Sequence, residues 1–133
     1  MEEAWTARRQ KLVHDYAITA WMVSPIPEVM ADAINNRNGA HVDAVDRLVV
    51  KLLVSPQATD SDFERESNKV LLQFWKEHEA FHSKSGHYAT RGHIWNSEYL
   101  TGNKSHVWHK QNTLPYFPTL GKIGMLLCSK ILL

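Results

Sequence analysis

Cysteine is nearly absent from this chain of 133 residues. The single cysteine, Cys128, excludes an internal disulfide and fits a reducing, intracellular compartment. Cys128 lies among aliphatic residues, with no histidine or asparagine close to it in the sequence that could activate a thiolate. We therefore interpret it as a small buried hydrophobic residue and not as a nucleophile.

Long apolar runs and a strong net charge are also lacking. A membrane-spanning helix needs about 20 apolar residues, but the aliphatic stretch near the C-terminus is short and is interrupted by Lys130. The acidic Glu2 and Glu3 and the basic Arg8 precede any apolar run, which predicts no signal peptide. The formal net charge of +1 gives no global attraction to nucleic acid or anionic membranes. The few glycines have neither the spacing of a phosphate-binding loop nor a strand before them.

Aromatic and aliphatic residues, in contrast, are plentiful. Five Trp, four Tyr and four Phe supply enough apolar surface to exclude a disordered chain. Apolar residues recur every three or four positions in the first 83 residues, which predicts helices. The predicted helices run from about Glu2 to Met22, from Pro27 through Ile34, from about His41 to Val54, and from Ser61 to about His82.

Several short motifs predict where these helices end. The sequence Ser24-Pro25-Ile26-Pro27 ends the first helix, because a residue before proline is pushed toward extended geometry. Asn38-Gly39 predicts a left-handed cap at the end of the second helix. Ser61-Asp62-Phe63-Glu64 has the pattern of a capping box and predicts the start of the fourth. The β-branched residues from Leu48 to Val54 would also suit a strand, but no second strand is present to pair with it.

The second part of the chain is less regular. Between residues 83 and 102 the periodicity fails, and we expect irregular chain with one helical turn near residues 95–100. Ser105 can cap a short helix that carries Val107 and Trp108. We therefore predict a mainly α, irregular helical bundle, with a helical segment over residues 1–83 and an irregular connection with C-terminal helices over residues 84–133.

An aliphatic helix is predicted after Pro118, although Gly121 and Gly124 weaken that prediction by about 1 kcal/mol each relative to alanine. Its apolar stripe consists of Leu120, Ile123 and Leu127, extended by Ile131. The last residues, Ile131 to Leu133, are as apolar as a core helix. We expect this tail to form half of a hydrophobic contact whose other half lies outside the chain.

This C-terminal stretch carries a family resemblance. Trp108, a short spacer, the aromatic pair Tyr116 and Phe117, Pro118 and the aliphatic stripe resemble the C-terminal dimerisation region of hAT-family DNA transposases. The strong match covers the last quarter of the chain, and a weaker match runs from His14 through Glu28. The chain departs from the family in having Val107 where many relatives have a second tryptophan.

The resemblance implies a non-catalytic role in protein dimerisation or packing within a transposon-derived nuclear protein. It also implies that the chain is a fragment of a larger RNase H-like transposase core with a helical insertion. DNA would be a partner only in the context of a full-length transposase, because the family's catalytic Glu would lie beyond Leu133 and its two Asp residues on strands that are not seen here. No catalytic residue can be carried over, and no cofactor is expected. The residues expected to form the hydrophobic contact are Trp108, Tyr116, Phe117, Leu120, Ile123 and Leu127.

The alternative function is a small zinc-dependent hydrolase. His78-Glu79-Ala80-Phe81-His82 has the pattern HExxH, which on a helix places both imidazoles on one face, where they can bind zinc with Glu79 as general base. A third ligand would be needed, and the candidates are His87, His93, His106 and His109.

The flanks of HExxH favour a structural interpretation. Charged residues, among them Lys76 and Glu77, surround the motif, whereas a helix buried under a metal is mostly uncharged there. We therefore expect His78 and His82 to be half-buried rings that continue the apolar stripe of the helix. The basic and aromatic residues around Trp108 could stack bases and hold phosphate, but core packing is the stronger expectation for that tryptophan. We interpret His106 and His109 as part of a solvated surface.

Overall fold

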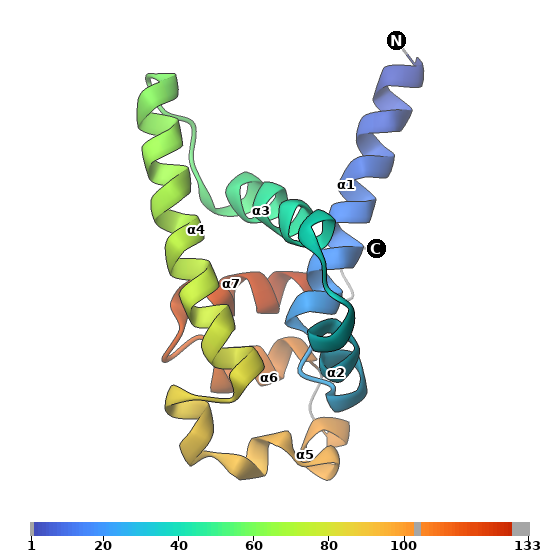
Figure 1. Cartoon of the computed structure of the whole chain (residues 1–133), viewed down its shortest axis with the longest axis vertical. Helices are drawn as coiled ribbons and strands as arrows, with labels where there is room; N and C mark the ends of the chain where they lie inside the picture. The colour runs from blue at the N-terminus through green and yellow to red at the C-terminus, as the bar shows by residue number, and fades with distance from the viewer. Residues whose placement is uncertain (1, 103–104, 129–133) are drawn as a thin grey trace.

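The computed structural model describes residues 2–102 and 105–128 of the chain. Within these ranges the protein is mainly α, as predicted, and contains no strand (Figure 1). The elements in chain order are α1 (Glu2–Val23), α2 (Pro27–Asn36), α3 (Gly39–Leu53), α4 (Asp60–Ser83), the 3₁₀ turns η1 (Gly86–Thr90) and η2 (Gly92–Trp95), α5 (Ser97–Gly102), α6 (Ser105–Asn112) and α7 (Pro118–Leu127).

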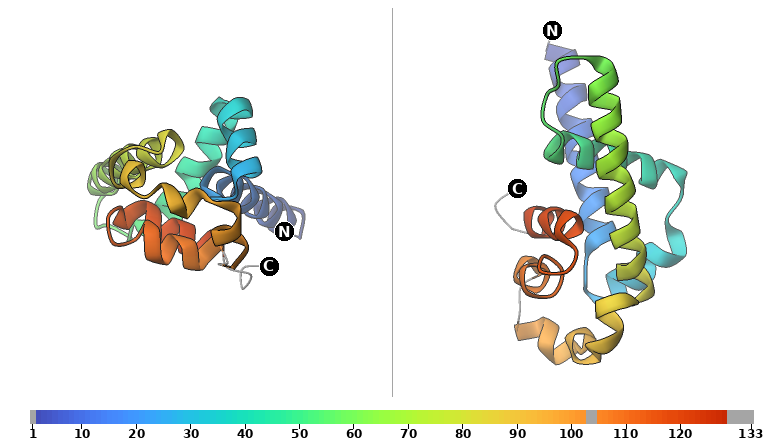
Figure 2. Two further views of the ribbon diagram at one scale, coloured as in Figure 1. Left: turned by 90° about the horizontal axis from the view of Figure 1, so that it is seen from below. Right: turned by 90° about the vertical axis from the view of Figure 1, so that its left-hand side faces the viewer.

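The two longest helices, α1 and α4, lie on opposite sides of the molecule (Figure 1). Helix α7 packs against both of them and against α6, while α2 follows the end of α1 and α5 lies at one end of the molecule (Figure 2). The N-terminal halves of α1 and α4 diverge from each other, with α3 crossing between them (Figure 1). They therefore extend past the common core as two arms.

Two predicted helix ends were wrong, because Asn38 caps the start of α3 and Thr59 caps the start of α4. Asn38 does not end α2 in a left-handed cap. It is extended, with φ −139°, and its side chain accepts from the backbone N–H of His41 at the start of α3. Helix α4 begins before Ser61, because Thr59 is its N-cap and accepts from the N–H of Asp62.

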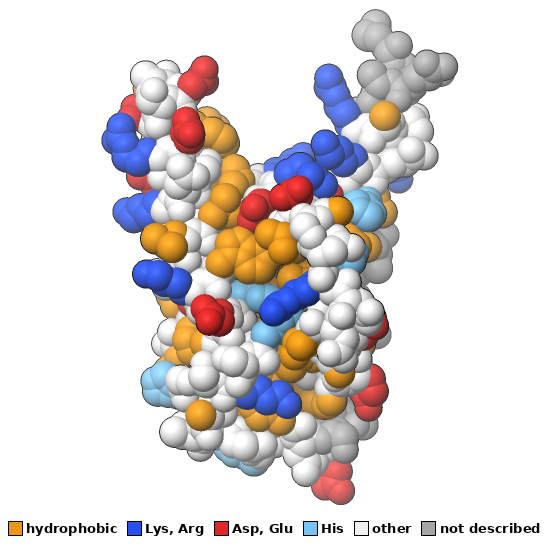
Figure 3. Space-filling view, in the orientation of Figure 1, with side chains coloured by type: hydrophobic (Ala, Val, Ile, Leu, Met, Phe, Trp, Pro, Cys, Tyr) orange, Lys and Arg blue, Asp and Glu red, His pale blue; other side chains and the backbone are white. Residues whose placement is uncertain are grey.

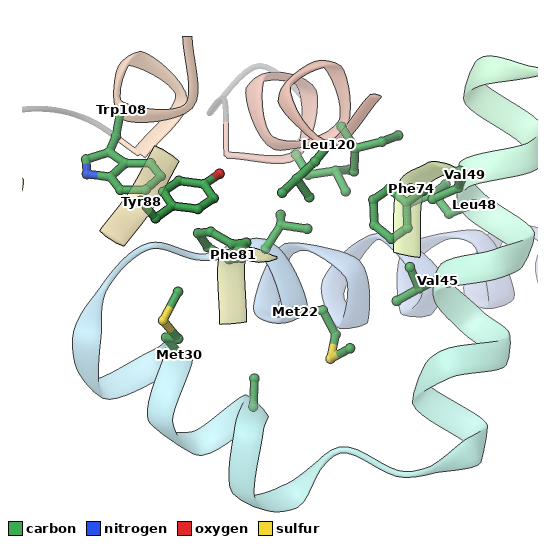
Figure 4. Packing of buried hydrophobic residues seen from close by; sticks show 14 of the residues in the cluster. Met22, Met30, Val45, Leu48, Val49, Phe74, Phe81, Tyr88, Trp108 and Leu120 are labelled. Carbon is green, nitrogen blue, oxygen red and sulfur yellow. The ribbon is translucent and has the colours of Figure 1, made fainter. Parts of the chain in front are cut away.

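One hydrophobic core contains side chains from both the helical segment over residues 1–83 and the rest of the described chain (Figure 4). Its largest fully buried side chains include Met22 of α1, Phe74 and Phe81 of α4, Tyr88 of η1 and Trp108 of α6. The indole N–H of Trp108 donates to the carbonyl oxygen of Ile94 at 2.9 Å, so its polar atom is satisfied inside the core. The expected core role of Trp108 is confirmed.

The glycines of α7 favour its packing although they weaken its helical propensity. A Cβ at Gly121 would lie 2.5 Å from the Cα of Leu114, and a Cβ at Gly124 would lie 2.4 Å from the ring of His109. Both distances are too short for any side chain, so only glycine lets α7 approach α6 and the turn after it this closely. In the part of the chain that the structure describes, no helix is long and apolar enough to cross a membrane.

Candidate functional site: three histidines at the end of helix α1

The last two carbonyl groups of α1 have no local donor. The carbonyl of Val23 would normally accept from the residue four positions later, which is Pro27 and has no N–H. The carbonyl of Met22 would accept from Ile26, whose N–H instead bonds to the hydroxyl oxygen of Ser24 at 3.3 Å. Buried carbonyls without a donor are costly, so this helix end needs donors from elsewhere in the fold.

Three buried histidines supply these donors. The Nε2 atoms of His78 and His82 on α4 lie 2.8 and 3.0 Å from the carbonyl oxygen of Met22, and Nε2 of His109 on α6 lies 2.6 Å from that of Val23. Because a carbonyl only accepts, all three rings carry their proton on Nε2. The histidines thereby attach the end of α1 to α4 and α6.

The other ring nitrogens of two of these histidines accept hydrogen bonds. Arg37 Nη1 lies 2.7 Å from Nδ1 of His82 and donates to it. The hydroxyl of Thr113 lies 3.0 Å from Nδ1 of His109 and 2.9 Å from the hydroxyl of Tyr88. Since Thr113 must donate its one proton to His109, Tyr88 donates to Thr113. Both rings are therefore held as neutral Nε2–H tautomers by their partners.

Burial keeps the three rings neutral at ordinary pH. It lowers the pKa of His78 to about 3, with a further decrease from the neighbouring His82, whose ring centroid is 4.0 Å away. Burial also lowers the pKa of His82 and of His109 to about 4, against the partial compensation of their bonds to the backbone carbonyls. The cause is the cost of placing a charged imidazolium in an apolar interior.

The HExxH pattern is therefore engaged with the backbone. His78 is 1% exposed and His82 9%, so the expectation of half-buried rings was wrong. A metal between their Nε2 atoms would have to displace the carbonyl of Met22. Glu79 is exposed, and the described residues contain no group of three or more His, Cys, Asp or Glu side chains that could hold a metal ion.

The four candidates for a third ligand lie in different environments. His109 alone approaches the pair, and it is fully buried, contrary to the expected solvated surface. His87 is exposed and stacks on Tyr116 with 3.9 Å between ring centroids, and His93 is exposed as well. His106 is half-buried on α6.

Glu77, next to His78, makes a second structural connection. This residue is only 3% exposed, despite its charge. One carboxylate oxygen accepts from the N–H of Leu120 in the first turn of α7 at 3.0 Å, and the other accepts from the side chain of Gln73 at 2.7 Å. The N-cap residue of α7, Phe117, has no capping side chain. Glu77 therefore supplies the cap and places a negative charge at the positive end of the helix dipole.

A hollow of about 490 Å³ opens above the histidine pair. Figure 3 shows histidine side chains at its centre, with basic, acidic and hydrophobic side chains around them. Its lining includes Arg37, Trp75 and Glu79 at the rim and His78 and His82 below. The indole N–H of Trp75 donates to Asp46 on α3, so the rim itself is fixed by contacts within the chain.

The residues that carry the transposase resemblance mostly build the core of this chain. Trp108, Leu120 and Ile123 are fully buried, Leu127 is 8% exposed, and Phe117 is half-buried against Tyr88. Among the six, Tyr116 has the most exposed side chain. The stripe of α7 is thus covered by its own chain. The tail from Ile131 to Leu133 lies outside the described residues.

Comparison with known proteins finds no match to a protein-family model, to a curated protein or to a solved structure. The transposase resemblance therefore stays a prediction. The histidine site could have been anticipated from one signal in the sequence. Because Pro27 removes the N–H that would meet the carbonyl of Val23, the end of α1 needed donors from distant residues.

Proposed function

We propose that this chain is a non-catalytic packing and self-association segment. The observation that carries the proposal is the shape of the molecule, in which the N-terminal halves of α1 and α4 extend past the common core as two arms (Figure 1). Both arms expose large apolar side chains. Val13 on α1 is 55% exposed, and Phe63 on α4 is 39% exposed.

The two arms also differ in charge. Residues 6–14 of α1 contain Arg8, Arg9 and Lys11 and no acidic residue. Residues 60–71 of α4 contain four acidic residues and two basic ones. Protruding surfaces with apolar groups and opposite charge are typical of protein interfaces, in which charge sets orientation and apolar contact supplies affinity.

The hydrogen bonds of the buried polar side chains support a non-catalytic role. Each ring of the histidine cluster donates to a backbone carbonyl, and Glu77 caps α7, so these groups are engaged in holding the helices together. Metal analysis of the purified protein tests the alternative hydrolase. One zinc per chain, lost in His78→Ala while the fold is kept, would contradict the proposed function.

Sedimentation velocity over a range of protein concentrations tests self-association directly. We expect a dimer that dissociates on dilution. A chain that stays monomeric at all concentrations, while its circular dichroism shows that it is helical and folded, would refute the proposal.

We further propose a transposon-derived origin, in which this chain is a helical part of an RNase H-like transposase in the nucleus. The residues from Trp108 to Leu127 support it by their pattern, and DNA would be contacted only through the full-length protein. The genomic sequence past the codon for Leu133 tests this origin. We expect an open frame that continues into a Ser/Ala-rich turn and a Glu-Arg pair.

A further inference from the structure

A groove lies between the two arms (Figure 3), and α3 crosses its floor (Figure 1). On one side, α1 and α3 enclose a hollow of about 270 Å³ whose lining includes Arg8, Lys11, Arg47 and Lys51. Asp15 neutralises one of these cations, because it binds Arg47 with two hydrogen bonds of 2.8 and 3.0 Å. We call this hollow the foot of the groove. Arg8, Lys11 and Lys51 remain there without an acidic residue to balance them, so the foot is basic.

The other side of the groove is apolar and acidic. Here α3 and α4 enclose a second hollow, whose lining includes Phe63, Glu64, Ser67 and Leu71 of α4. Asp60 falls on the same helical stripe as Glu64, Ser67 and Leu71. Arg65 and Lys69 fall on the opposite side of that helix. The face of α4 toward the groove is thus apolar, and Asp60 and Glu64 lie near the N-terminal end of the helix, which we call its acidic tip.

We propose that the acidic tip of α4 from a second copy of the chain seats in the basic foot of this groove, and that the contact is reciprocal. This inference rests on the proposed self-association and assigns it to a surface. In a two-fold dimer each α4 tip enters the groove of the partner, so the two α4 helices pair antiparallel through Phe63 and Leu71. Asp60 and Glu64 of each copy then meet Arg8, Lys11 and Lys51 of the other.

This arrangement satisfies the requirement that a two-fold interface be self-complementary. The protruding element is acidic at its tip, and the recess is basic at its foot, on the same molecule. Each dimer contains the contact twice. The charges on both sides are exposed in the single chain, so they can be changed without disturbing the core.

Charge reversal with mutual rescue tests the proposal. The tip variant carries Asp60→Lys and Glu64→Lys, and the foot variant carries Lys11→Glu and Lys51→Glu. Each should raise the dissociation constant of the dimer by about tenfold or more, since like charges then face each other twice. Mixed together, the two variants should form a heterodimer, because both contacts again join opposite charges.

Exposed charges away from the groove provide the control. Glu79→Lys on α4 and Lys110→Glu on α6 each reverse one charge of the same sign as those changed in the tip and foot variants, and we expect both to dimerise as the unchanged chain does. Circular dichroism and thermal unfolding verify that all variants are folded. Raising the salt concentration should weaken the unchanged dimer, because exposed charge pairs are screened.

The outcomes separate this inference from the proposed function. A dimer that persists unchanged in both reversed variants would overturn the groove contact and leave self-association standing. A monomeric unchanged chain would overturn both. Two monomeric variants that fail to associate when mixed would also contradict the reciprocal contact. If the chain is monomeric and its groove binds a nucleic-acid duplex or an acidic peptide of another protein, that ligand and not a second copy is the occupant, and the proposal is overturned.

Discussion

Acid should unfold this protein at a pH where most helical domains are stable, because three buried histidines must be neutral in the fold. In the unfolded chain each histidine titrates near pH 6.5, whereas in the fold the pKa of His78 is about 3 and that of His82 and His109 about 4. Between these values the unfolded chain binds more protons than the folded one. Stability is therefore fully present above pH 6.5 and is lost as the pH falls toward 4.

The expected loss is large relative to the stability of a small domain. At pH 5, about 1.5 units below the unfolded pKa, a fully buried neutral histidine contributes about 2 kcal/mol of destabilisation. His78 and His109 each reach this value. His82 lines the open hollow and is still 9% exposed, so we reduce its share to about 1 kcal/mol. The sum of about 5 kcal/mol compares with a typical unfolding free energy of about 5–15 kcal/mol.

Urea unfolding at pH 7.5, 6.5, 5.5 and 5.0, followed by tryptophan fluorescence and far-ultraviolet circular dichroism, measures this loss. The variant His109→Gln, whose amide can still donate to the carbonyl of Val23, should be less stable at pH 7.5 and should show a shallower decrease toward pH 5. The matched control is His93→Gln, which changes an exposed ring and should keep the full decrease. An unfolding free energy that is the same at pH 7.5 and pH 5.0 would refute the reasoning.

Three further predictions concern the packing of α6 and α7. Gly121→Ala should destabilise the fold by about 2 kcal/mol or more in thermal unfolding, because its Cβ would meet the backbone of Leu114, whereas Gly39→Ala, with nothing within 4 Å, should be neutral or slightly stabilising. Glu77→Ala should cost about 1–3 kcal/mol in urea unfolding, because it leaves the N-terminus of α7 without its cap. Trp108→Ala should cost about 3–5 kcal/mol, and dimerisation of the chain that remains folded should be unchanged. If Trp108→Ala is fully folded but dimerises more weakly, Trp108 belongs to the interface instead.

The helices could be predicted from local pattern, but their exact ends could not. The apolar period located α3 and α4 closely, because each buries one face against the common core. The bounds of α1 were also close, although this helix has little apolar face and buries Asp15 and Thr19 beside Met22 and Val23. At the start of α4, Thr59 and Ser61 are both capping residues two positions apart, and only the direction of the preceding chain decides between them. Asn38 could end one helix or begin the next, and its contact with His41 decided for the second.

The candidate site could be predicted in position but not in role. The spacing of His78 and His82 correctly placed both rings on one face of a helix. Their partner, the carbonyl of Met22, is 56 and 60 residues away in the sequence, and no local pattern reports such a contact. The same holds for Glu77, because the N–H of Leu120 to which it binds is 43 residues away in the sequence.

The histidine site illustrates how a metal-binding pattern can arise from a backbone requirement. After α1, Pro27 has no N–H for the carbonyl of Val23, and Ser24 takes the N–H of Ile26 that would meet the carbonyl of Met22. An imidazole with its proton on Nε2 is long enough to reach both carbonyls from a neighbouring helix. Residues four apart on α4 present two such rings to the same point, so the spacing that suits zinc also suits a carbonyl oxygen. Whether the rings face an orphan carbonyl decides between the two interpretations. Here the carbonyl of Met22 needs donors and His78 and His82 supply them, which favours the structural role over a zinc site.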